Sequence, residues 1–219
     1  MGKQALVLAG LLLAPSGARP QEPDFVPPAP GTYQLQHILR APEGTVLDRD
    51  GEAKRLSRFT TGRITVLSLI YTRCGDGQGC PLATYLLKSL KGRIDQRRGW
   101  SDSLRFVSLS FDPDHDTPAV MRAYARGYAP DDTGLPWHFL TTRSRRDLRP
   151  LLDGFAQDVW MAGEGSGAGA LPHVLKVFLI DRYGWVREIY TTSFLQPQMV
   201  LNDIETLLGE GSRLISKRP

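Results

Sequence analysis

The hydrophobic and polar positions of the chain switch repeatedly between strand-like and helix-like patterns. Residues 64–71 form a largely apolar run rich in β-branched residues, which is typical of a strand buried on both faces. Residues 105–111 are expected to form a second strand. After Cys80 and Pro81, leucine recurs every four residues, which predicts an amphipathic helix that opens with proline. The pattern therefore begins as strand, helix, strand.

The same patterns place further elements on both sides of this unit. They predict a hairpin over residues 44–47 and 53–56, helices starting at 118 and 145, a short strand at 137–140, a hairpin over 174–180 and 185–190, and a last helix from 197. This order describes an α/β fold with a central sheet flanked by helices and an N-terminal hairpin, compatible with a thioredoxin-like fold. Spacing alone also allows a small doubly wound domain.

The N-terminal residues resemble a targeting segment. Residues 1–18 combine Lys3, an apolar run and small residues, which is typical of a cleavable secretory signal peptide. The run of about ten apolar residues is short for a bilayer-spanning helix, which needs about 17–25. We therefore expect an exported, periplasmic protein with a proline-rich tether at 19–42, a folded domain at 43–210 and a C-terminal tail at 211–219.

Composition excludes little beyond nucleic-acid binding. The 219 residues are 41% hydrophobic, enough for one substantial core, and carry a net charge of +4. The 27 basic residues are spread along the chain. The arginines within 143–149 come nearest to a basic patch, and we interpret them as the solvated face of a helix. No nucleic-acid partner is expected.

The chain has two cysteines, Cys74 and Cys80, in a position suited to chemistry. Cys74 follows a predicted buried strand and Cys80 begins a helix, where α/β proteins expose their working groups. The helix N-terminus is expected to lower the pKa of the Cys80 thiol. Three glycines between the cysteines would let both sulfurs face one point. A structural disulfide is the plainer alternative, although a domain of this size hardly needs so short a ring.

A third metal ligand would come from the four histidines. His173 is the favoured candidate because Pro172 restricts its backbone and because it precedes a predicted strand. Two thiolates and one imidazole suit copper and, by ligand softness, zinc. The alternative for His173 is an ordinary surface or hydrogen-bonded histidine. His37 and His138 are weaker candidates.

His115 lies in an acidic segment, residues 112–116, that could suggest a site for a harder metal. A turn followed by Thr117 as the N-cap of the next helix explains the segment more simply. We therefore interpret it as a turn.

Several motifs together resemble the Sco/SenC family over roughly residues 43–208. They are Tyr71-Thr72-Arg73-Cys74, Cys80-Pro81, Phe111-Asp112-Pro113, Asp116-Thr117-Pro118, and His173 ahead of Phe178-Leu179-Ile180-Asp181. The resemblance implies a thioredoxin-like fold and one copper ion bound by Cys74, Cys80 and His173. It also implies a role in maturing the binuclear copper centre of cytochrome c oxidase. The partner would be a copper-accepting oxidase subunit or another periplasmic copper or thiol protein, with membrane contact only through that partner.

The chain departs from the family pattern at one motif, and the function has alternatives. The family has three residues between its cysteines, whereas Cys74 and Cys80 are separated by five. The leading hypothesis is a metallochaperone, which needs no catalytic turnover. The alternatives are a thiol-disulfide oxidoreductase or a redox sensor that uses Cys74 and Cys80 as its redox-active pair. The two-residue spacing of thioredoxin motifs counts against the oxidoreductase.

Overall fold

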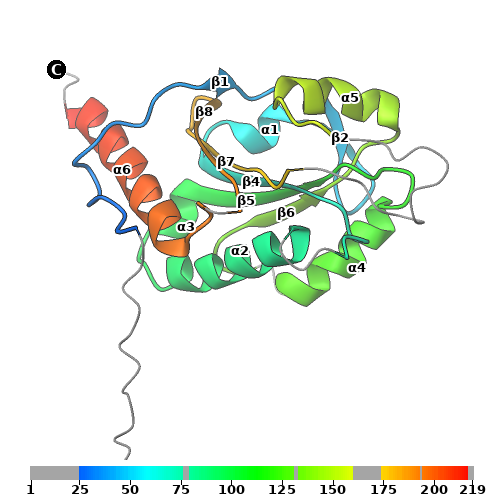
Figure 1. Ribbon diagram of the computed structural model, residues 1–219, viewed down its shortest axis with the longest axis horizontal. Helices are drawn as coiled ribbons and strands as arrows, with labels where there is room; N and C mark the ends of the chain where they lie inside the picture. The colour runs from blue at the N-terminus through cyan, green and yellow to red at the C-terminus, as the bar shows by residue number, and fades with distance from the viewer. Residues whose placement is uncertain (1–24, 76–78, 131–132, 160–173, 193, 217–219) are drawn as a thin grey trace, which may run out of the picture.

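The centre of the protein is a six-stranded mixed sheet in the order β1-β8-β7-β4-β5-β6 (Figure 1). The computed structural model describes residues 25–75, 79–130, 133–159, 174–192 and 194–216, with side chains to residue 211. The strands are β1 (Leu39–Arg40), β4 (Ile64–Ile70), β5 (Leu104–Ser110), β6 (Trp137–Leu140), β7 (Val177–Ile180) and β8 (Trp185–Tyr190). The expected α/β fold with a central sheet is confirmed.

The strand directions bring several loops to one edge of the sheet. β4, β5 and β6 are parallel, whereas β7 runs antiparallel to β4 and β8 antiparallel to β7. Ser68 pairs with Val177, which in turn pairs with Tyr190. The carboxyl ends of β4, β5 and β8 therefore meet the start of β7 at one edge.

Helices cover both faces of this sheet. Figure 1 shows α2 and α4 on one side and α1 and α5 on the other. The helices are α1 (Ser57–Thr60), α2 (Cys80–Asp95), α3 (Trp100–Ser103), α4 (Pro118–Tyr128), α5 (Arg145–Gly154) and α6 (Pro197–Ser216). Because both faces are covered, every residue of β4 and of β5 is buried, as the largely apolar run predicts for β4. The buried positions include polar residues, such as Ser68 and Ser108. Burial of each large apolar side chain contributes about 1.5–3 kcal/mol.

The predicted N-terminal hairpin is present as β2 (Thr45–Leu47) and β3 (Ala53–Arg55). One carboxylate oxygen of Asp48 accepts the N–H groups of Asp50 and Glu52 at 3.0 and 2.9 Å. Gly51 has a φ of +82°, a conformation that glycine adopts without strain. An antiparallel bridge from Leu47 to Thr141 joins the hairpin to the end of β6.

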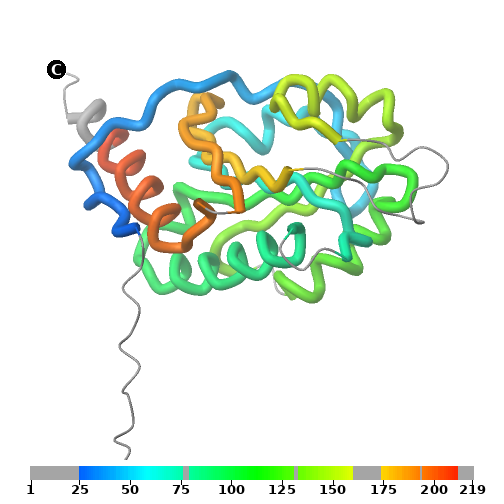
Figure 2. Tube along the Cα trace, viewed as in Figure 1, coloured from blue at the N-terminus to red at the C-terminus, as the bar shows by residue number. Residues whose placement is uncertain are grey.

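The N-terminal segment from Phe25 to Arg40 packs against the domain, contrary to the expectation that the folded unit begins after the proline-rich segment. Figure 2 shows it running alongside α6 and then reaching β8. Asn202 donates to the Pro28 carbonyl oxygen at 2.8 Å, and the Tyr33 hydroxyl donates to Asp203 at 2.5 Å. Polar side chains of α6 thus hold a segment whose own sequence has no periodic pattern.

Three short elements, β1, α1 and α3, are absent from the sequence-based prediction. Each has four residues or fewer, too few to display a hydrophobic period. At the other end of the chain, α6 continues to Ser216, beyond the start of the predicted tail at 211.

Candidate metal centre

The two cysteines flank the junction between β4 and α2. Cys74 follows the end of β4 by four residues, and its N–H donates to the Tyr71 carbonyl oxygen at 3.3 Å. Cys80 is the first residue of α2, with Pro81 next to it in the first turn. Cys80 is buried and Cys74 is half-buried. Both are described, and neither takes part in a disulfide.

The structure brings the two predicted sulfur ligands together. The Cys74 side chain is hydrogen-bonded to Cys80 and interacts with it electrostatically. Two thiols that can deprotonate at a common point form a soft donor pair. The third predicted ligand, His173, lies outside the described residues, as do residues 76–78 of the glycine-rich loop.

The residue that follows His173 in the chain is described. The side chain of Gln157 donates to the Val174 carbonyl oxygen at 3.1 Å, and Val174 precedes β7 by three residues. β7 begins at the same edge of the sheet at which β4 ends.

The expected effect of the helix N-terminus on Cys80 is wrong in direction. Burial raises the pKa of the Cys80 thiol, and the charge of Cys74 and the hydrogen bond with it raise the pKa further. Hydrogen bonds with the backbone of Tyr71 and of Cys80 itself lower it by less. Loss of water around the sulfur outweighs these backbone hydrogen bonds. A raised pKa disfavours Cys80 as an attacking thiolate, whereas a coordinated metal ion deprotonates such a thiol outright.

Asp116 fixes the backbone that leads into Cys74. Its buried carboxylate accepts the Thr72 N–H at 2.9 Å and the Thr72 hydroxyl at 2.5 Å. The Ser110 hydroxyl donates to the same carboxylate at 2.5 Å, and the His115 ring nitrogen Nδ1 lies 2.9 Å from it. The loop after β5 thus holds the loop after β4 through one side chain.

Asp112 makes a second link between these two loops. Arg73, next to Cys74, donates to the Asp112 carboxylate at 2.7 Å. The Asp112 side chain is 2% exposed and that of Arg73 is 45% exposed. Thr72 and Arg73, the two middle residues of the Tyr71–Cys74 turn, are therefore each held by a carboxylate of the loop after β5.

Asp112, His115 and Asp116 could form a metal-binding group, because their ligand atoms lie within 4.8 Å of one another. Both carboxylates, however, already accept from protein donors: Asp116 from Thr72 and Ser110, and one oxygen of Asp112 from Arg73. Thr117 also caps α4, accepting the Val120 N–H at 3.4 Å. These contacts favour the interpretation as a structured turn. The sequence analysis gives Asp112 and Asp116 no role of their own. Both belong to motifs that carry the family resemblance, and this is the signal that could have singled them out.

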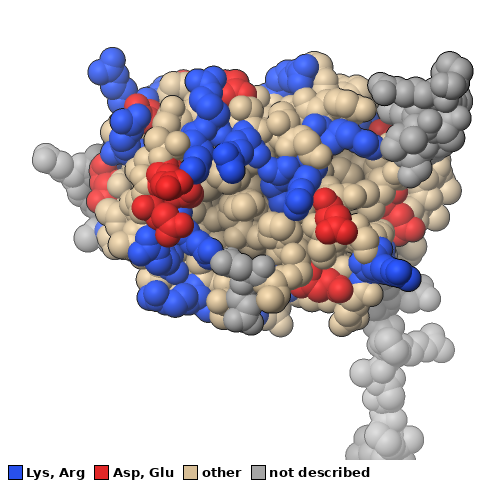
Figure 3. Space-filling view, turned by 180° about the vertical axis from the view of Figure 1, so that it is seen from behind, with Lys and Arg blue, Asp and Glu red and all other residues tan. Residues whose placement is uncertain are grey.

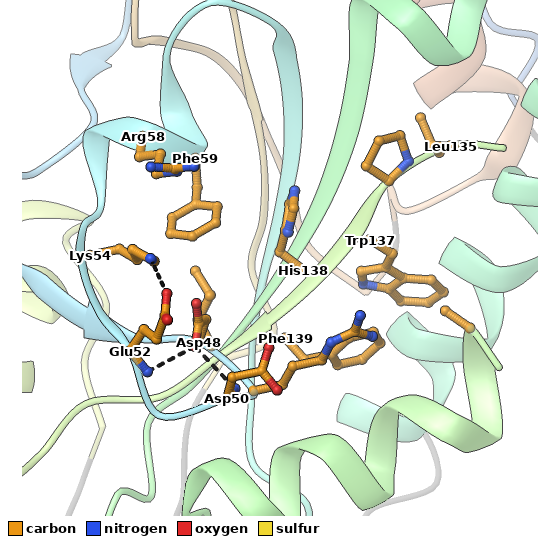
Figure 4. Close-up of a pocket in the computed structure, with 14 residues that line it drawn as sticks. Asp48, Asp50, Glu52, Lys54, Arg58, Phe59, Leu135, Trp137, His138 and Phe139 are labelled. Atoms are coloured by element: carbon orange, nitrogen blue, oxygen red, sulfur yellow. Dashed lines mark hydrogen bonds and ion pairs between the residues drawn. The ribbon is translucent and has the colours of Figure 1, made fainter. Parts of the chain in front are cut away.

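The weaker histidine candidates lie elsewhere. His138 lines a cavity of about 470 Å³ between the β2–β3 hairpin and the edge strand β6. Figure 4 shows His138 between Phe59 and Trp137, and its ring centroid is 5.0 Å from that of Phe59. His37 lies against Trp185 at the start of β8, the opposite end of the sheet from Cys74.

Among the residues that the structure describes, no helix combines the length and apolar character needed to span a bilayer.

A central mixed sheet with a cysteine pair between a buried strand and the following helix defines a protein of the thioredoxin-like class. The family model for SCO1/SenC matches residues 42–209, and the chain belongs to this family. No curated protein sequence matches the chain significantly.

Solved structures with the same fold include several Sco proteins. The Bradyrhizobium japonicum ScoI structure with copper bound matches with a TM-score of 0.62 and 19% identity, covering 78% of this chain and 99% of that chain. The yeast Sco1 structure with copper bound matches with a TM-score of 0.62 and 15% identity, covering 83% and 96%. BsSco, described as a member of the Sco family of cytochrome c oxidase assembly proteins, matches with a TM-score of 0.61 and 19% identity, covering 80% and 98%.

Proposed function

We propose that this protein is an exported copper metallochaperone that binds one copper ion through Cys74, Cys80 and His173 and delivers it to a respiratory oxidase. The observation that carries the proposal is the meeting of the Cys74 and Cys80 thiols at the carboxyl end of β4. In a member of the SCO1/SenC family this pair is a natural soft-metal site. Relatives of the same fold that have been solved with copper bound support the choice of metal.

His173 is proposed as the nitrogen ligand. Support comes from Val174, its neighbour in the chain, which leads into β7 at the edge of the sheet where β4 ends. A neutral imidazole completes a three-ligand site that retains the copper yet can exchange it with an acceptor.

Delivery to an oxidase copper centre is the proposed destination of the ion. Family membership supports it, together with the description of BsSco as one of the cytochrome c oxidase assembly proteins. Export to the periplasm, proposed from the signal-like residues 1–18, would put the protein in the compartment of such an acceptor. The mechanism is ligand exchange and requires no catalytic turnover.

Anaerobic titration of the reduced protein with Cu(I), followed by spectroscopy of sulfur and nitrogen ligation, tests the site. We expect one copper ion per chain with two sulfur ligands and one nitrogen ligand. Cys74→Ser, Cys80→Ser and His173→Ala should each weaken copper binding at least about tenfold. His37→Ala is the matched control, since His37 lies at the other end of the sheet, and should bind copper as the unmodified protein does.

The oxidoreductase alternative gives a different pattern. Reduction of insulin disulfides would depend on Cys74 and Cys80 and would be unaffected by His173→Ala. Tight binding of one copper ion by the His173→Ala protein would exclude the proposed ligand set.

A further inference from the structure

The amino ends of β4 and β5 form a second polar site, at the opposite edge of the sheet from Cys74. A pocket of about 430 Å³ opens there between the entrance to β4, the residues around α3, and α6. The hydrogen bond from the Gly62 N–H to the Arg182 carbonyl oxygen, 2.8 Å, joins the β7–β8 turn to the entrance of β4. β4 has seven residues, so about 20 Å of sheet separates this pocket from the cysteines.

Three arginines line the pocket against one aspartate, Asp102. Arg63 and Arg182 are half-buried and Arg98 is exposed. Among the described residues, none of the three has a carboxylate within ion-pair distance, Asp102 included. Their neighbour Arg97, in contrast, pairs with Glu205 at 3.1 Å.

A fourth arginine beside the pocket adds to this unbalanced charge. Arg105 is 9% exposed and donates to the carbonyl oxygens of Arg58 and Thr61 at 2.6 and 2.7 Å. Its Nε has no hydrogen-bond partner. Burial and the charge of Arg63 lower the pKa of Arg105 to about 10. Burial is the larger of the two causes, and the repulsion from Arg63 shows that the two guanidinium groups lie close enough to interact.

The lining has the chemistry of an oxyanion site. Guanidinium groups present paired N–H donors that match the oxygens of a phosphate group, and half-buried cations gain most from an anion because they have lost part of their hydration. Trp100 also lines the pocket, and the Arg97 guanidinium lies over its ring at 4.3 Å. The volume accommodates a phosphate group with a small substituent. Figure 3 shows Lys and Arg side chains in several groups over one face of the molecule, with Asp and Glu side chains between them.

We propose that the pocket lined by Arg63, Arg98 and Arg182 binds a phosphate group, carried either by a soluble phosphate compound or by an anionic lipid headgroup. The site is separate from the copper chemistry, so its test is independent of the copper site. Phosphate oxygens would accept from the three guanidinium groups, and Asp102 would oppose binding.

The test uses the full chain in phosphate-free buffer with two probes. Calorimetric titration with inorganic phosphate and with pyrophosphate, at matched ionic strength, measures soluble phosphate. Sedimentation with phosphatidylcholine vesicles, with and without phosphatidylglycerol, measures headgroup binding. We expect saturable binding of at least one probe. Arg63→Gln and Arg182→Gln should each weaken it about tenfold.

Two further variants make the result specific to the pocket. Asp102→Asn should tighten binding severalfold, because it removes the one carboxylate of the lining. Arg146→Gln, which removes an exposed arginine of α5 outside the pocket, should leave binding unchanged. Binding of phosphate or pyrophosphate assigns the site to a soluble compound, and binding of phosphatidylglycerol vesicles alone assigns it to a headgroup. Absence of binding to every probe, or an equal loss in the Arg146→Gln protein, overturns the proposal.

Discussion

The carboxylate of Asp116 accepts the backbone N–H of Thr72 at 2.9 Å, and so ties the loop after β5 to the residue two positions before Cys74. This contact spans 44 positions of sequence. The position of Cys74 is thus set by an acidic side chain from the neighbouring strand's loop.

Asp116→Ala should both destabilise the fold and weaken copper binding. The substitution leaves the donors of half-buried Thr72 and buried Ser110 without their acceptor, which costs about 3 kcal/mol of unfolding free energy. Urea denaturation measures this loss, and Cu(I) titration of the folded variant should show affinity lowered about tenfold. Asp114→Ala is the control in the same loop, because Asp114 is 58% exposed and pairs with exposed Arg145. It should cost less than about 1 kcal/mol. Equal losses in the two variants would contradict the role of Asp116.

Cys74 should react with iodoacetamide much faster than Cys80 in the reduced, metal-free protein. Cys74 is half-buried, whereas Cys80 is 1% exposed and burial raises the pKa of its thiol. Both effects slow alkylation of Cys80, and we expect a rate difference of at least about tenfold. Mass spectrometry of the Cys74→Ser and Cys80→Ser proteins measures each remaining thiol separately. A faster reaction at Cys80 would contradict the burial of its thiol at the start of α2.

The contribution of Asp203 to the free energy of unfolding should fall as the pH rises from about 4 to 7. Burial raises the pKa of this carboxyl above its ordinary 3.8, although hydrogen bonds from Tyr33 and Tyr190 lower it. The folded protein therefore keeps a proton that the unfolded chain has already released. The contribution of Asp203 to the free energy of unfolding is favourable below the unfolded pKa and is lost as the pH rises through the raised folded pKa.

Urea denaturation at a series of pH values from about 4 to 7 measures this effect. The difference in unfolding free energy between the unmodified protein and Asp203→Asn should fall with increasing pH. Glu205→Gln, which alters an exposed carboxylate of the same helix, serves as the control. If the difference between these two unfolding free energies rises with pH, the pKa of Asp203 is not raised in the folded protein.

Arg187→Ala should release the N-terminal segment. The buried Arg187 guanidinium donates to the Leu35 carbonyl oxygen at 2.6 Å and pairs with Asp181 and Glu210 at 3.1 Å each. Its removal leaves the buried Asp181 carboxylate without its arginine, with only backbone N–H donors and exposed His37 near it, which costs about 3 kcal/mol. Limited proteolysis should cut the segment before Leu39 sooner than in the unmodified protein. Arg149→Ala, which breaks an exposed pair with Asp153, should cost about 0.5 kcal/mol or less and leave proteolysis unchanged.

The fold was predictable where a single segment carries its own signal. β4 is buried at every position, and its largely apolar, β-branched sequence predicts such a strand without reference to the rest of the chain. The Ser144 side chain caps α5 by accepting the Asp147 N–H at 3.2 Å. A serine three residues before the donor is a signal that the local sequence carries. The packing of residues 25–40 depends instead on Asp203 and Arg187, more than 140 positions away, and no local pattern reports such contacts.

The candidate site divides in the same way. The placement of Cys74 and Cys80 at a strand-to-helix junction follows from local patterns and is confirmed. The pKa of Cys80 was predicted in the wrong direction because burial, which the tertiary packing decides, outweighs the backbone hydrogen bonds that lower it. The contact of Asp116 with Thr72 likewise requires knowing that the loops after β4 and β5 are neighbours.

Because Thr72 and Arg73 are tied to the loop of the next strand while Cys80 is built into the first turn of α2, each cysteine is attached to the scaffold independently of the glycine-rich residues that connect them. The length of that connection can then vary while its two attachment points keep their places. The fold therefore tolerates five residues between the cysteines in place of three. Removing two glycines from this connection is a direct way to change the relative position of the two sulfur atoms.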